Sequence, residues 1–420
     1  MERSGRIVEK ALVPAVVYPV NRVNGYNAVR SLAAAGIPVI GLSADYTENL
    51  KSVYLCEAYV TPHAACETEA FIDFLINLMR GRDGKPVLFV MDDAYAFVVS
   101  VHQERLQPHF RYPYLDRSQL EAVIDKRVMH DTAMAAGMDL PETFFPEDLD
   151  WVMSNAGKLR YPVVIKPLVS RFAYEGEEIV QVSAFLQRYG KAVEAGSARE
   201  LVMTLPGIVM EGFAVCVQER INCRIADLWT HNFYCDDGGE ILAGFNGRKL
   251  HQQPADFGIC TVGMAAQNPG VVEESKKFLQ HVGYRGLGSM EYIKTGDGYK
   301  FVEINPRGEF WNGLAATCNV NLYKLAYDHL CGRPISPDDY RQSAVPKIWY
   351  DLSKFHKFVR YRERDITMSR FILVPKMEAI ANFKDRGLMV GRIRTVAGMW
   401  LRLAFRKLRF AFRPTRVEVR

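Results

Sequence analysis

A hairpin signal at residues 286–307 constrains the fold of this chain more than any other feature. The apolar stretches GLGSMEYIK and YKFVEINPR flank a Gly-Asp-Gly turn at 296–298, which is a strong indication of two antiparallel strands. If the loop has three residues, Glu291 lies directly opposite Glu303. Asn305 then shares their face, because side chains alternate along a strand.

Two like charges opposite each other destabilise a strand pair unless a cation lies between them. Three oxygen ligands on one face suit Mg²⁺ or Mn²⁺, which bind carboxylates together with phosphate oxygens. Arg307 follows at the end of the strand, where its guanidinium can contact a phosphate. The alternative is a hairpin with one solvated face, on which the two acids cost little free energy.

Residues 11–60 have the order strand, helix, strand, in the stretches ALVPAVVYPV, YNAVRSLAAAG and IPVIGLS. A crossover of this length joins parallel strands. The stretch KPVLFVMDD adds another strand and puts Asp92 and Asp93 at its carboxyl end, where open parallel sheets bind ligands. The same acids are equally suited to cap the helix that follows, and both interpretations stay open.

Cations recur in the middle of the chain. Lys166 is near the end of the β-branched stretch YPVVIKP, and a buried lysine needs an anionic partner. Lys126 precedes it, and GFNGRKLHQQP adds Arg248 and Lys249. Such cations beside a carboxylate pair match the needs of a magnesium–nucleotide site, although a single lysine is commonly a surface residue with a buried stem. No G-x-x-x-x-G-K-[ST] motif is present, which excludes a P-loop.

The composition bounds the class of protein. The chain has 420 residues, 49% of them apolar, enough for two or three domains with full cores. No stretch reaches the ~18 apolar residues of a spanning helix, and the N-terminal run predicts a strand, not a signal peptide. Eight cysteines without a C-x-x-C pair argue against a zinc site and disulfides. We therefore expect a cytoplasmic protein.

In their order along the chain, these motifs resemble the ATP-grasp superfamily. The resemblance extends over about residues 12–335 and rests on Lys126, Lys166, the stretch VQERI and the hairpin GSMEYIKTGDGYKFVEINPR. It implies a mixed α/β and α+β fold with three parts. These are a pre-ATP-grasp, Rossmann-like parallel-sheet domain at 1–120, an ATP-grasp domain of two α+β subdomains at 121–340 with its lid subdomain at about 158–222, and a C-terminal extension at 341–420 with a basic amphipathic helix.

The resemblance also implies residue roles. Lys126 and Lys166 would contact the ATP phosphates, Glu219 and Ile221 would frame the adenine through backbone groups, and Asp227 would bind the ribose. Members of the superfamily often cover the phosphates with a glycine-rich loop. Here the corresponding stretch, PLVSRFAYEGEEIV, has one glycine, so the expected covering residues are Ser170, Arg171 and Tyr174.

The remaining implied roles concern the metal and the reaction. Glu291, Glu303 and Asn305 would hold Mg²⁺, Arg307 would stabilise the transferring phosphoryl group, and Arg248 and Lys249 would orient an acylphosphate. His251 is either a base or a structural histidine.

The implied activity is an ATP-dependent ligation of a carboxylate to an amine through an acylphosphate, with release of ADP and phosphate. AVRSLAAAGIPVIGL and GFNGRKLHQQPADFGICTVG are similar to a predicted carboligase group that includes D-aspartate ligases. One alternative is a nucleotide-binding regulatory protein with a degenerate site. Another is a carboxylase or kinase of the same fold, although no MKM-like biotin-carrier segment occurs.

Basic residues concentrate at the C-terminus. Residues 386–420 hold nine arginines and one lysine against one glutamate, so the rest of the chain is slightly acidic and has no nucleic-acid signature. Residues 392–413 predict an amphipathic helix with one arginine face, typical of an anchor to an anionic membrane surface. In that case the substrate would be an envelope or lipid-linked precursor. The alternative is a helix packed on the protein or on a second subunit of a homodimer.

Overall fold

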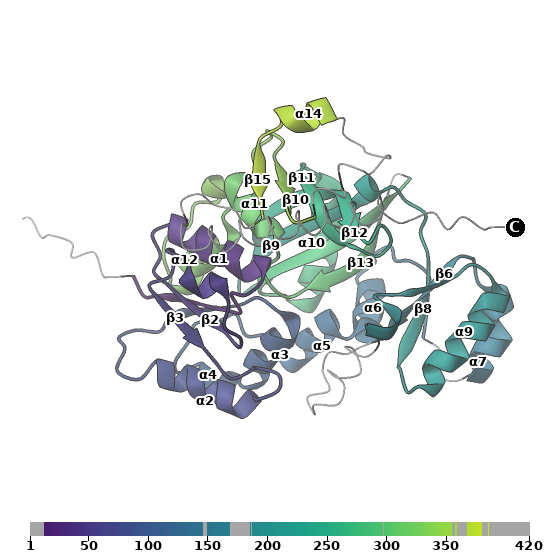
Figure 1. Cartoon of the computed structure of the whole chain (residues 1–420), viewed down its shortest axis with the longest axis horizontal. Coiled ribbons are helices and arrows are strands. Elements are labelled where there is room, and N and C mark those ends of the chain that lie inside the picture. Colours follow the sequence, from purple (N-terminus) through teal and green to yellow (C-terminus); the bar gives the residue numbers. More distant parts are fainter. Residues whose placement is uncertain are drawn as a thin grey trace, which may run out of the picture.

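The computed structural model of the chain is shown in Figure 1. The residues that it describes are 12–145, 149–168, 185, 187–296, 298–354, 358, 368–379 and 385. They form three β-sheets with helices packed on them. The basic C-terminal helix expected at 392–413 and the expected covering residues Ser170, Arg171 and Tyr174 lie outside the described residues.

The first sheet is parallel and has the strand order β3-β2-β1-β4. Every residue of β1, β2 and β4 is buried, as expected for strands that are covered on both faces. The strands are β1 Ala15–Tyr18, β2 Val39–Ser43, β3 Glu57–Val60 and β4 Val87–Val90. The helical segments beside them are α1 Val23–Ala34, η1 Glu48–Lys51, α2 Thr68–Leu78, α3 Asp93–Val101 and α4 Gln103–Leu106. The predicted parallel sheet is confirmed.

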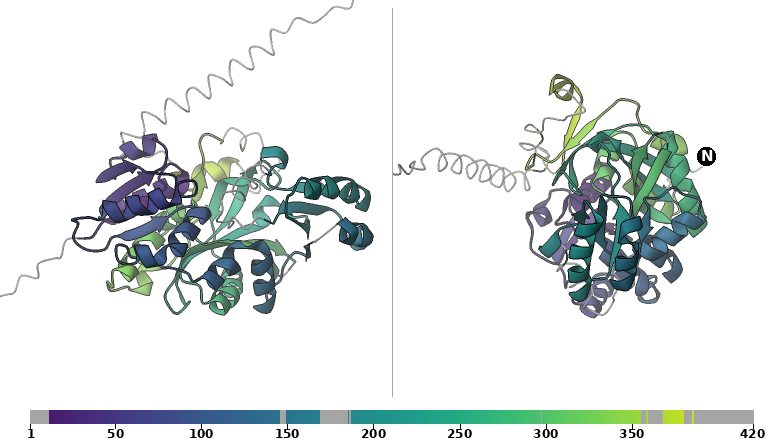
Figure 2. Two further views of the ribbon diagram at one scale, coloured as in Figure 1. Left: turned by 90° about the horizontal axis from the view of Figure 1, so that it is seen from below. Right: turned by 90° about the vertical axis from the view of Figure 1, so that its right-hand side faces the viewer.

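The second sheet is small and antiparallel, with the order β5-β8-β6-β7. Its strands are β5 Thr143–Phe144, β6 Val163–Pro167, β7 Val193–Ala195 and β8 Val215–Glu219. One face packs on α7 Leu149–Asn155, η2 Ala156–Lys158 and α9 Ala198–Met210 through an apolar cluster. Figures 1 and 2 show this sheet and its helices at one end of the molecule, with the parallel sheet at the other.

The third sheet lies between these two and has seven strands in the order β13-β12-β9-β10-β11-β14-β15. Its pairs are antiparallel except β14–β15. The strands are β9 Leu228–Cys235, β10 Ile241–Gln253, β11 Ile259–Ala265, β12 Gly286–Thr295, β13 Gly298–Asn305, β14 Ile348–Tyr350 and β15 Lys376–Glu378.

Helices cover both faces of the large sheet. One face packs against α5 Arg117–Ile124, α6 Lys126–Ala135 and α10 Pro269–Val282. The opposite face packs against α11 Trp311–Thr317 and α12 Leu322–Leu330, which also contact α1. Three further short elements are η3 Ile225–Asp227, η4 Pro337–Tyr340 and α14 Met368–Leu373. The predicted combination of α/β and α+β parts is therefore confirmed.

In the described ranges, no helix combines the length and the apolar character that a crossing of the bilayer requires.

Candidate active site

The β12–β13 hairpin places Glu291 directly opposite Glu303, as the sequence predicts. The expected three-residue loop is wrong, because Thr295 pairs with Gly298 and two residues join the strands. In a regular ladder this shorter turn would bring Val302 opposite Glu291. A β-bulge lies between the pairs Glu291–Glu303 and Tyr292–Phe301. It accommodates Val302 as the extra residue and so restores the carboxylate pair. Bulges of this kind re-aim side chains beside functional sites.

The Lys249 ammonium lies next to this carboxylate pair. Its Nζ donates to Oε2 of Glu291 at 3.0 Å, and only 10% of the lysine side chain is exposed. Burial by itself lowers the pKa of Lys249, but Glu291, with smaller contributions from Cys260 and Glu303, more than offsets this, so the pKa is raised. Burial raises the pKa of Glu291, and Lys249 together with Lys191 and Arg307 reverses the shift and lowers it. Both groups are therefore charged at neutral pH.

Polar side chains continue the same face of the sheet. Asn305 of β13 pairs with Ser289 of β12, which pairs with Asn232 of β9. Asn232 donates to the Thr230 hydroxyl at 3.1 Å, and Thr230 lies opposite Glu291. In the described part of the chain, the buried Oδ1 of Asn232 and Oγ of Ser289 have no hydrogen-bond partner. This face therefore presents unsatisfied oxygen atoms beside the two carboxylates.

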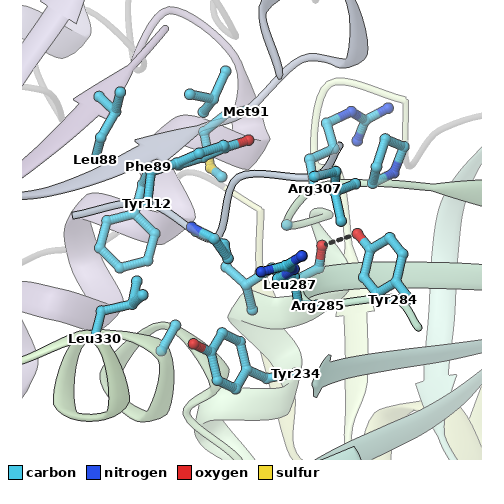
Figure 3. Close-up of a pocket in the computed structure, with 16 residues that line it drawn as sticks. Leu88, Phe89, Met91, Tyr112, Tyr234, Tyr284, Arg285, Leu287, Arg307 and Leu330 are labelled. Carbon is cyan, nitrogen blue, oxygen red and sulfur yellow. Dashed lines mark hydrogen bonds between the residues drawn. The ribbon is translucent and has the colours of Figure 1, made fainter. Parts of the chain in front are cut away.

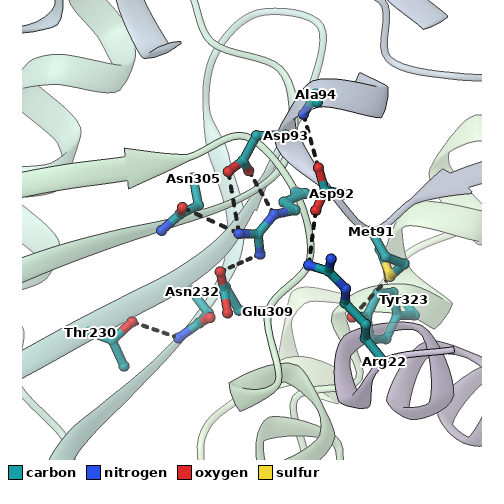
Figure 4. A network of polar contacts seen from close by, with 11 residues as sticks. Arg22, Met91, Asp92, Asp93, Ala94, Thr230, Asn232, Asn305, Glu309 and Tyr323 are labelled. Carbon is teal, nitrogen blue, oxygen red and sulfur yellow. Dashed lines mark hydrogen bonds and ion pairs between the residues drawn. The ribbon is translucent and has the colours of Figure 1, made fainter. Parts of the chain in front are cut away.

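Arg307 joins this face to the parallel sheet. Its Nε lies 2.6 Å from Oδ1 of Asp93, it forms a second ion pair with Glu309, and Nη2 donates to the Asn305 amide oxygen at 3.4 Å (Figure 4). Burial lowers the pKa of Arg307, but Asp93 and Glu309 raise it above its ordinary value. Burial raises the pKa of Glu309 despite the guanidinium. Arg307 is thus held at a defined position where two sheets meet.

The two acids after β4 have separate roles, which the sequence left open. Asp92 is the N-cap of α3, since its side chain accepts from the backbone N–H of Ala94 at 3.1 Å. It also lies 3.3 Å from the exposed guanidinium of Arg22. Asp93 turns toward Arg307 instead (Figure 4). Asp92 therefore caps the helix and Asp93 pairs with Arg307, and a contact of either acid with a ligand stays a prediction.

Lys126 and Lys166 meet at the end of β6. Lys126 begins α6 and donates through Nζ to the carbonyl of Pro167 at 2.9 Å. Lys166 donates to Oε1 of Gln218 on β8 at 2.6 Å. Burial, and next the Lys126 charge, lower the pKa of Lys166, while the carboxylates of Glu303 and Glu291 act in the opposite direction. Lys166 therefore adds a cation from the small sheet to the electrostatic surroundings of the hairpin carboxylates, and Lys126 of α6 lies beside it.

No family model matches the sequence. A D-aspartate ligase from Enterococcus faecium (strain Aus0004) is 22% identical over 383 residues, which span 82% of this chain and 87% of that protein. Of the solved structures, an L-amino acid ligase from Bacillus licheniformis has a TM-score of 0.57 at 14% identity, over 79% of this chain and 77% of that one. An N5-carboxyaminoimidazole synthetase from Staphylococcus aureus complexed with ADP has a TM-score of 0.60 at 14% identity, over 84% and 87% of the two chains. The chain has the ATP-grasp fold.

The donor set fits a divalent cation in this ATP-grasp site. Among the described residues no cluster of three or more His, Cys, Asp or Glu side chains could hold a metal. Two carboxylates and an amide, those of Glu291, Glu303 and Asn305, nevertheless share one face. Opposed carboxylates and unsatisfied buried oxygens beside them favour a hard cation with additional oxygen ligands from a substrate. These three residues would hold Mg²⁺.

Of the residues expected at the adenine and ribose, Glu219 and Ile221 lie at the end of the small sheet, and Asp227 lies in η3 beside the large sheet. Glu219 ends β8, and its carboxylate accepts from the Glu142 N–H at 3.3 Å and lies 4.0 Å from Nζ of Lys300. Ile221 follows in a half-buried loop. Asp227 is engaged by Arg224, which donates to it from Nε at 3.1 Å and Nη2 at 2.9 Å. A ribose would have to compete with that guanidinium, and these three roles stay predictions.

Arg248 and Lys249 project to opposite faces of β10, because they are consecutive residues in a regular part of the strand. Lys249 alone of the two reaches Glu291, so the structure does not bring the predicted pair together. His251 is buried, and its Nδ1 lies 2.5 Å from the Thr261 hydroxyl. Its ring also packs edge-on against Phe358. The roles predicted for Arg248 and His251 stay predictions.

Sequence reasoning missed several polar residues of the site. Glu309 has no predicted role, although it lies two residues after Arg307 and forms an ion pair with its guanidinium. Gln218 has no predicted role either, although its amide links Lys166 to the Thr143 hydroxyl. Asn232 gives no sequence signal, because it is buried within an apolar strand and joins the site only through strand pairing.

Proposed function

We propose that this ATP-grasp protein is an ADP-forming carboxylate–amine ligase. The observation that carries the proposal is the ion pair of Lys249 with Glu291, which faces Glu303, together with Arg307 and Lys166 in the electrostatic surroundings of this pair. Lys126 lies beside Lys166. A triphosphate and its metal need such an arrangement of cations and carboxylates. The similarity to an amino-acid ligase in sequence and to another in fold supports an amino acid as the carboxylate substrate.

The reaction proposed here has two steps. A carboxylate oxygen attacks the γ-phosphorus of ATP, the bond to the β-phosphate oxygen breaks, and ADP leaves with that electron pair. The amine then attacks the acyl carbon, the C–N bond forms, the bond to the phosphate oxygen breaks, and the amine proton ends on inorganic phosphate. Mg²⁺ bound by Glu291, Glu303 and Asn305 would offset the charge of the phosphate oxygens.

The residues of the chain contribute position and charge. Lys166 from the small sheet and Lys126 from the start of α6 neutralise phosphate oxygens, and the Gln218 amide orients the Lys166 ammonium. Arg307, held by Asp93 and Glu309, presents its guanidinium to the carboxylate and to the developing acylphosphate. No protein nucleophile is needed, because the acylphosphate forms on the substrate itself.

ADP release tests this proposal. The purified protein is incubated with ATP, Mg²⁺ and pairs of amino acids, including D-forms, and ADP, phosphate and the amide are quantified. We expect ADP and amide in equal amounts for at least one pair. Glu303→Gln should abolish turnover, whereas Glu273→Gln, the same exchange on the exposed face of α10, should not.

The alternatives predict other results in the same assay. ATP binding without ADP release for any pair would favour a regulatory protein. ADP release that needs bicarbonate, or that yields a stable phosphorylated product without an amine, would favour a carboxylase or a kinase.

We further propose that the amine or carboxylate belongs to an envelope or lipid-linked precursor, on the basis of the basic sequence 392–413. Sedimentation with anionic liposomes tests this, using the full chain and a variant truncated after residue 391. Equal pelleting of both proteins would dispose of the membrane proposal and leave packing within the protein or a homodimer as the role of this segment.

A further inference from the structure

Residues 306–310, the Arg307 segment, join β13 to α11. Pro306, Arg307 and Gly308 border a cavity of about 30 Å³, which has room for about one water molecule (Figure 3). Atoms that line such a void lose packing contacts on that side. Packing around the segment is thus incomplete, so its position depends more strongly on its polar contacts.

A buried asparagine of α1 supplies one of these contacts. The side chain of Asn27, which has no exposed surface, donates through Nδ2 to the Phe310 carbonyl at 3.2 Å. Phe310 is the N-cap of α11, and the preceding residue, Glu309, forms an ion pair with Arg307. The Asn27 amide also packs on Gly313, where a Cβ would come within 2.6 Å of its Cγ. Asn27 therefore ties the parallel-sheet unit to the end of the Arg307 segment.

The other end of the Asn27 amide is fixed as well. Its Oδ1 accepts from Nη2 of Arg30 at 2.8 Å, so its Nδ2 is the atom that faces Phe310. The Arg30 guanidinium lies 5.6 Å from the centre of the Tyr26 ring, within the range of a cation–π contact. The Tyr26 hydroxyl in turn donates to the buried carboxylate of Asp385 at 3.0 Å. Contacts along α1 thus orient the Asn27 amide.

We propose that Asn27 is a positioning residue of the proposed active site. By holding the Phe310 carbonyl, it fixes the backbone at the start of α11 and with it the place of Glu309, whose carboxylate pairs with the Arg307 guanidinium. The kinetic consequence of this role rests on the proposed function. Its effect on the backbone of the Arg307 segment does not.

Asn27→Asp tests the role with little change in shape. The new carboxylate can still accept from Arg30, but it cannot donate to the Phe310 carbonyl and repels that oxygen. With the amino-acid pair that the wild type ligates, we expect kcat for ADP release to fall about 10- to 100-fold. The KM for ATP should stay near the wild-type value, because Lys126 and Lys166 are untouched. An unchanged stoichiometry of ATP binding in calorimetry shows that the loss does not come from unfolded protein.

Asn321→Asp is the matched control. Asn321, the N-cap of α12, also binds α1, because its Nδ2 donates to the Ser31 carbonyl at 2.9 Å. Its Oδ1 accepts from the Lys324 N–H at 3.1 Å, which a carboxylate can still do. The exchange thus removes an equivalent contact of α1 away from the Arg307 segment, and kcat should stay near the wild-type value. An equal fall of kcat in both variants would show that these contacts only stabilise the fold and would overturn the proposal.

Gly313→Ala is a second test, which keeps Asn27 itself. The added methyl group must displace the Asn27 amide from its place beside α11. We expect kcat to fall here as well, again with the KM for ATP unchanged. A wild-type kcat in this variant or in Asn27→Asp would overturn the proposal.

Hydrogen exchange without substrates tests the backbone independently of the reaction. The N–H groups of Asn312 and Gly313 donate to the carbonyls of Glu309 and Phe310 at 3.0 and 3.2 Å. In Asn27→Asp, peptides that cover residues 306–314 should exchange faster, whereas those of α12 should not, and Asn321→Asp should show the reverse. Unchanged exchange at 306–314 in Asn27→Asp would overturn the inference. The expected exchange pattern in a protein whose wild type releases no ADP would support the positioning role and contradict only the proposed function.

Discussion

At the scale of single residues, the site is a balance of opposed charges. Glu291 and Glu303 repel each other across the hairpin, and Lys249 compensates Glu291 in a mostly buried ion pair. Functional sites commonly retain such unfavourable pairs because the substrate complex needs them. Removal of the lysine charge and removal of one carboxylate charge should therefore have opposite effects on the stability of the fold.

Lys249→Met should destabilise the protein by about 3 kcal/mol, because it leaves two facing carboxylates without their cation. Glu303→Gln should raise stability by up to about 1 kcal/mol, because it removes a like-charge pair while abolishing ADP release. Urea unfolding without Mg²⁺ measures both. A Glu303→Gln protein less stable than the wild type would contradict the inference that Glu291 and Glu303 destabilise the fold by repelling each other.

Lys166 predicts a pH dependence of ATP binding. Its pKa in the free protein lies below the ordinary 10.5, chiefly because of burial and then because of Lys126. Bound phosphates would raise it, so the complex binds more protons than the free protein at alkaline pH. Affinity for ATP should therefore fall as pH rises from the lowered pKa toward 10.5.

Calorimetry in two buffers of different ionisation enthalpy measures the proton uptake. Lys166→Met should bind ATP more weakly and lose the part of this uptake that Lys166 contributes. An unchanged uptake in that variant would show that another group is responsible.

At the scale of elements, strand alternation and close glycine contacts position the site. Along β6, Val163 and Ile165 face the helices of the small sheet, so the alternate residue Lys166 faces the other way, toward Gln218. On the large sheet, Trp311 of α11 packs directly over Gly247 and Gly263. A Cβ on these glycines would come within 2.8 Å and 2.2 Å of the Trp311 ring.

Gly263→Ala should therefore destabilise the protein by about 1–3 kcal/mol, because the ring must move away from the sheet. The displacement would extend to the segment with Arg307 and Glu309 that precedes α11, so ADP release should fall as well. The control is Gly207→Ala in α9, where nothing lies within 4 Å of the added Cβ. This control should be neutral or stabilising by about 0.5–1 kcal/mol. Equal thermal midpoints for the two variants would contradict the packing argument.

At the scale of the whole molecule, the parallel sheet completes the site of the large sheet. Asp93 at the start of α3 and Arg307 after β13 are far apart in sequence, and their ion pair fixes the guanidinium from the opposite side. A second link joins the same unit to a C-terminal residue, since the buried Asp385 accepts from the Tyr26 hydroxyl at 3.0 Å. The segment after β13 and Asp385 near the C-terminus therefore both contact the N-terminal unit with the parallel sheet.

Asp93→Asn should lower kcat for ADP release about 10- to 100-fold, because Arg307 loses a charged partner and its defined position. The KM for ATP should stay near the wild-type value, because Lys126 and Lys166 are untouched. Asp73→Asn, which removes an exposed partner of Arg105 in the same unit, should leave both constants unchanged. A raised KM for ATP with normal kcat in Asp93→Asn would place this residue at the nucleotide instead.

Local sequence patterns were sufficient to predict the parallel N-terminal strands and the β12–β13 hairpin, whereas they predicted Glu291 opposite Glu303 through a three-residue loop that the structure does not have. These features depend on local periodicity, turn residues and cross-strand pairing, which a short stretch of chain encodes. The packing of the folded chain was needed to see that Lys249 pairs with Glu291, that Asp93 and Glu309 hold Arg307, and that Asn232 joins the site. Each of these contacts joins side chains whose approach depends on how sheets, strands and loops pack. The turn of the hairpin is one residue shorter than the sequence predicts. The β-bulge compensates for this difference and keeps Glu291 opposite Glu303.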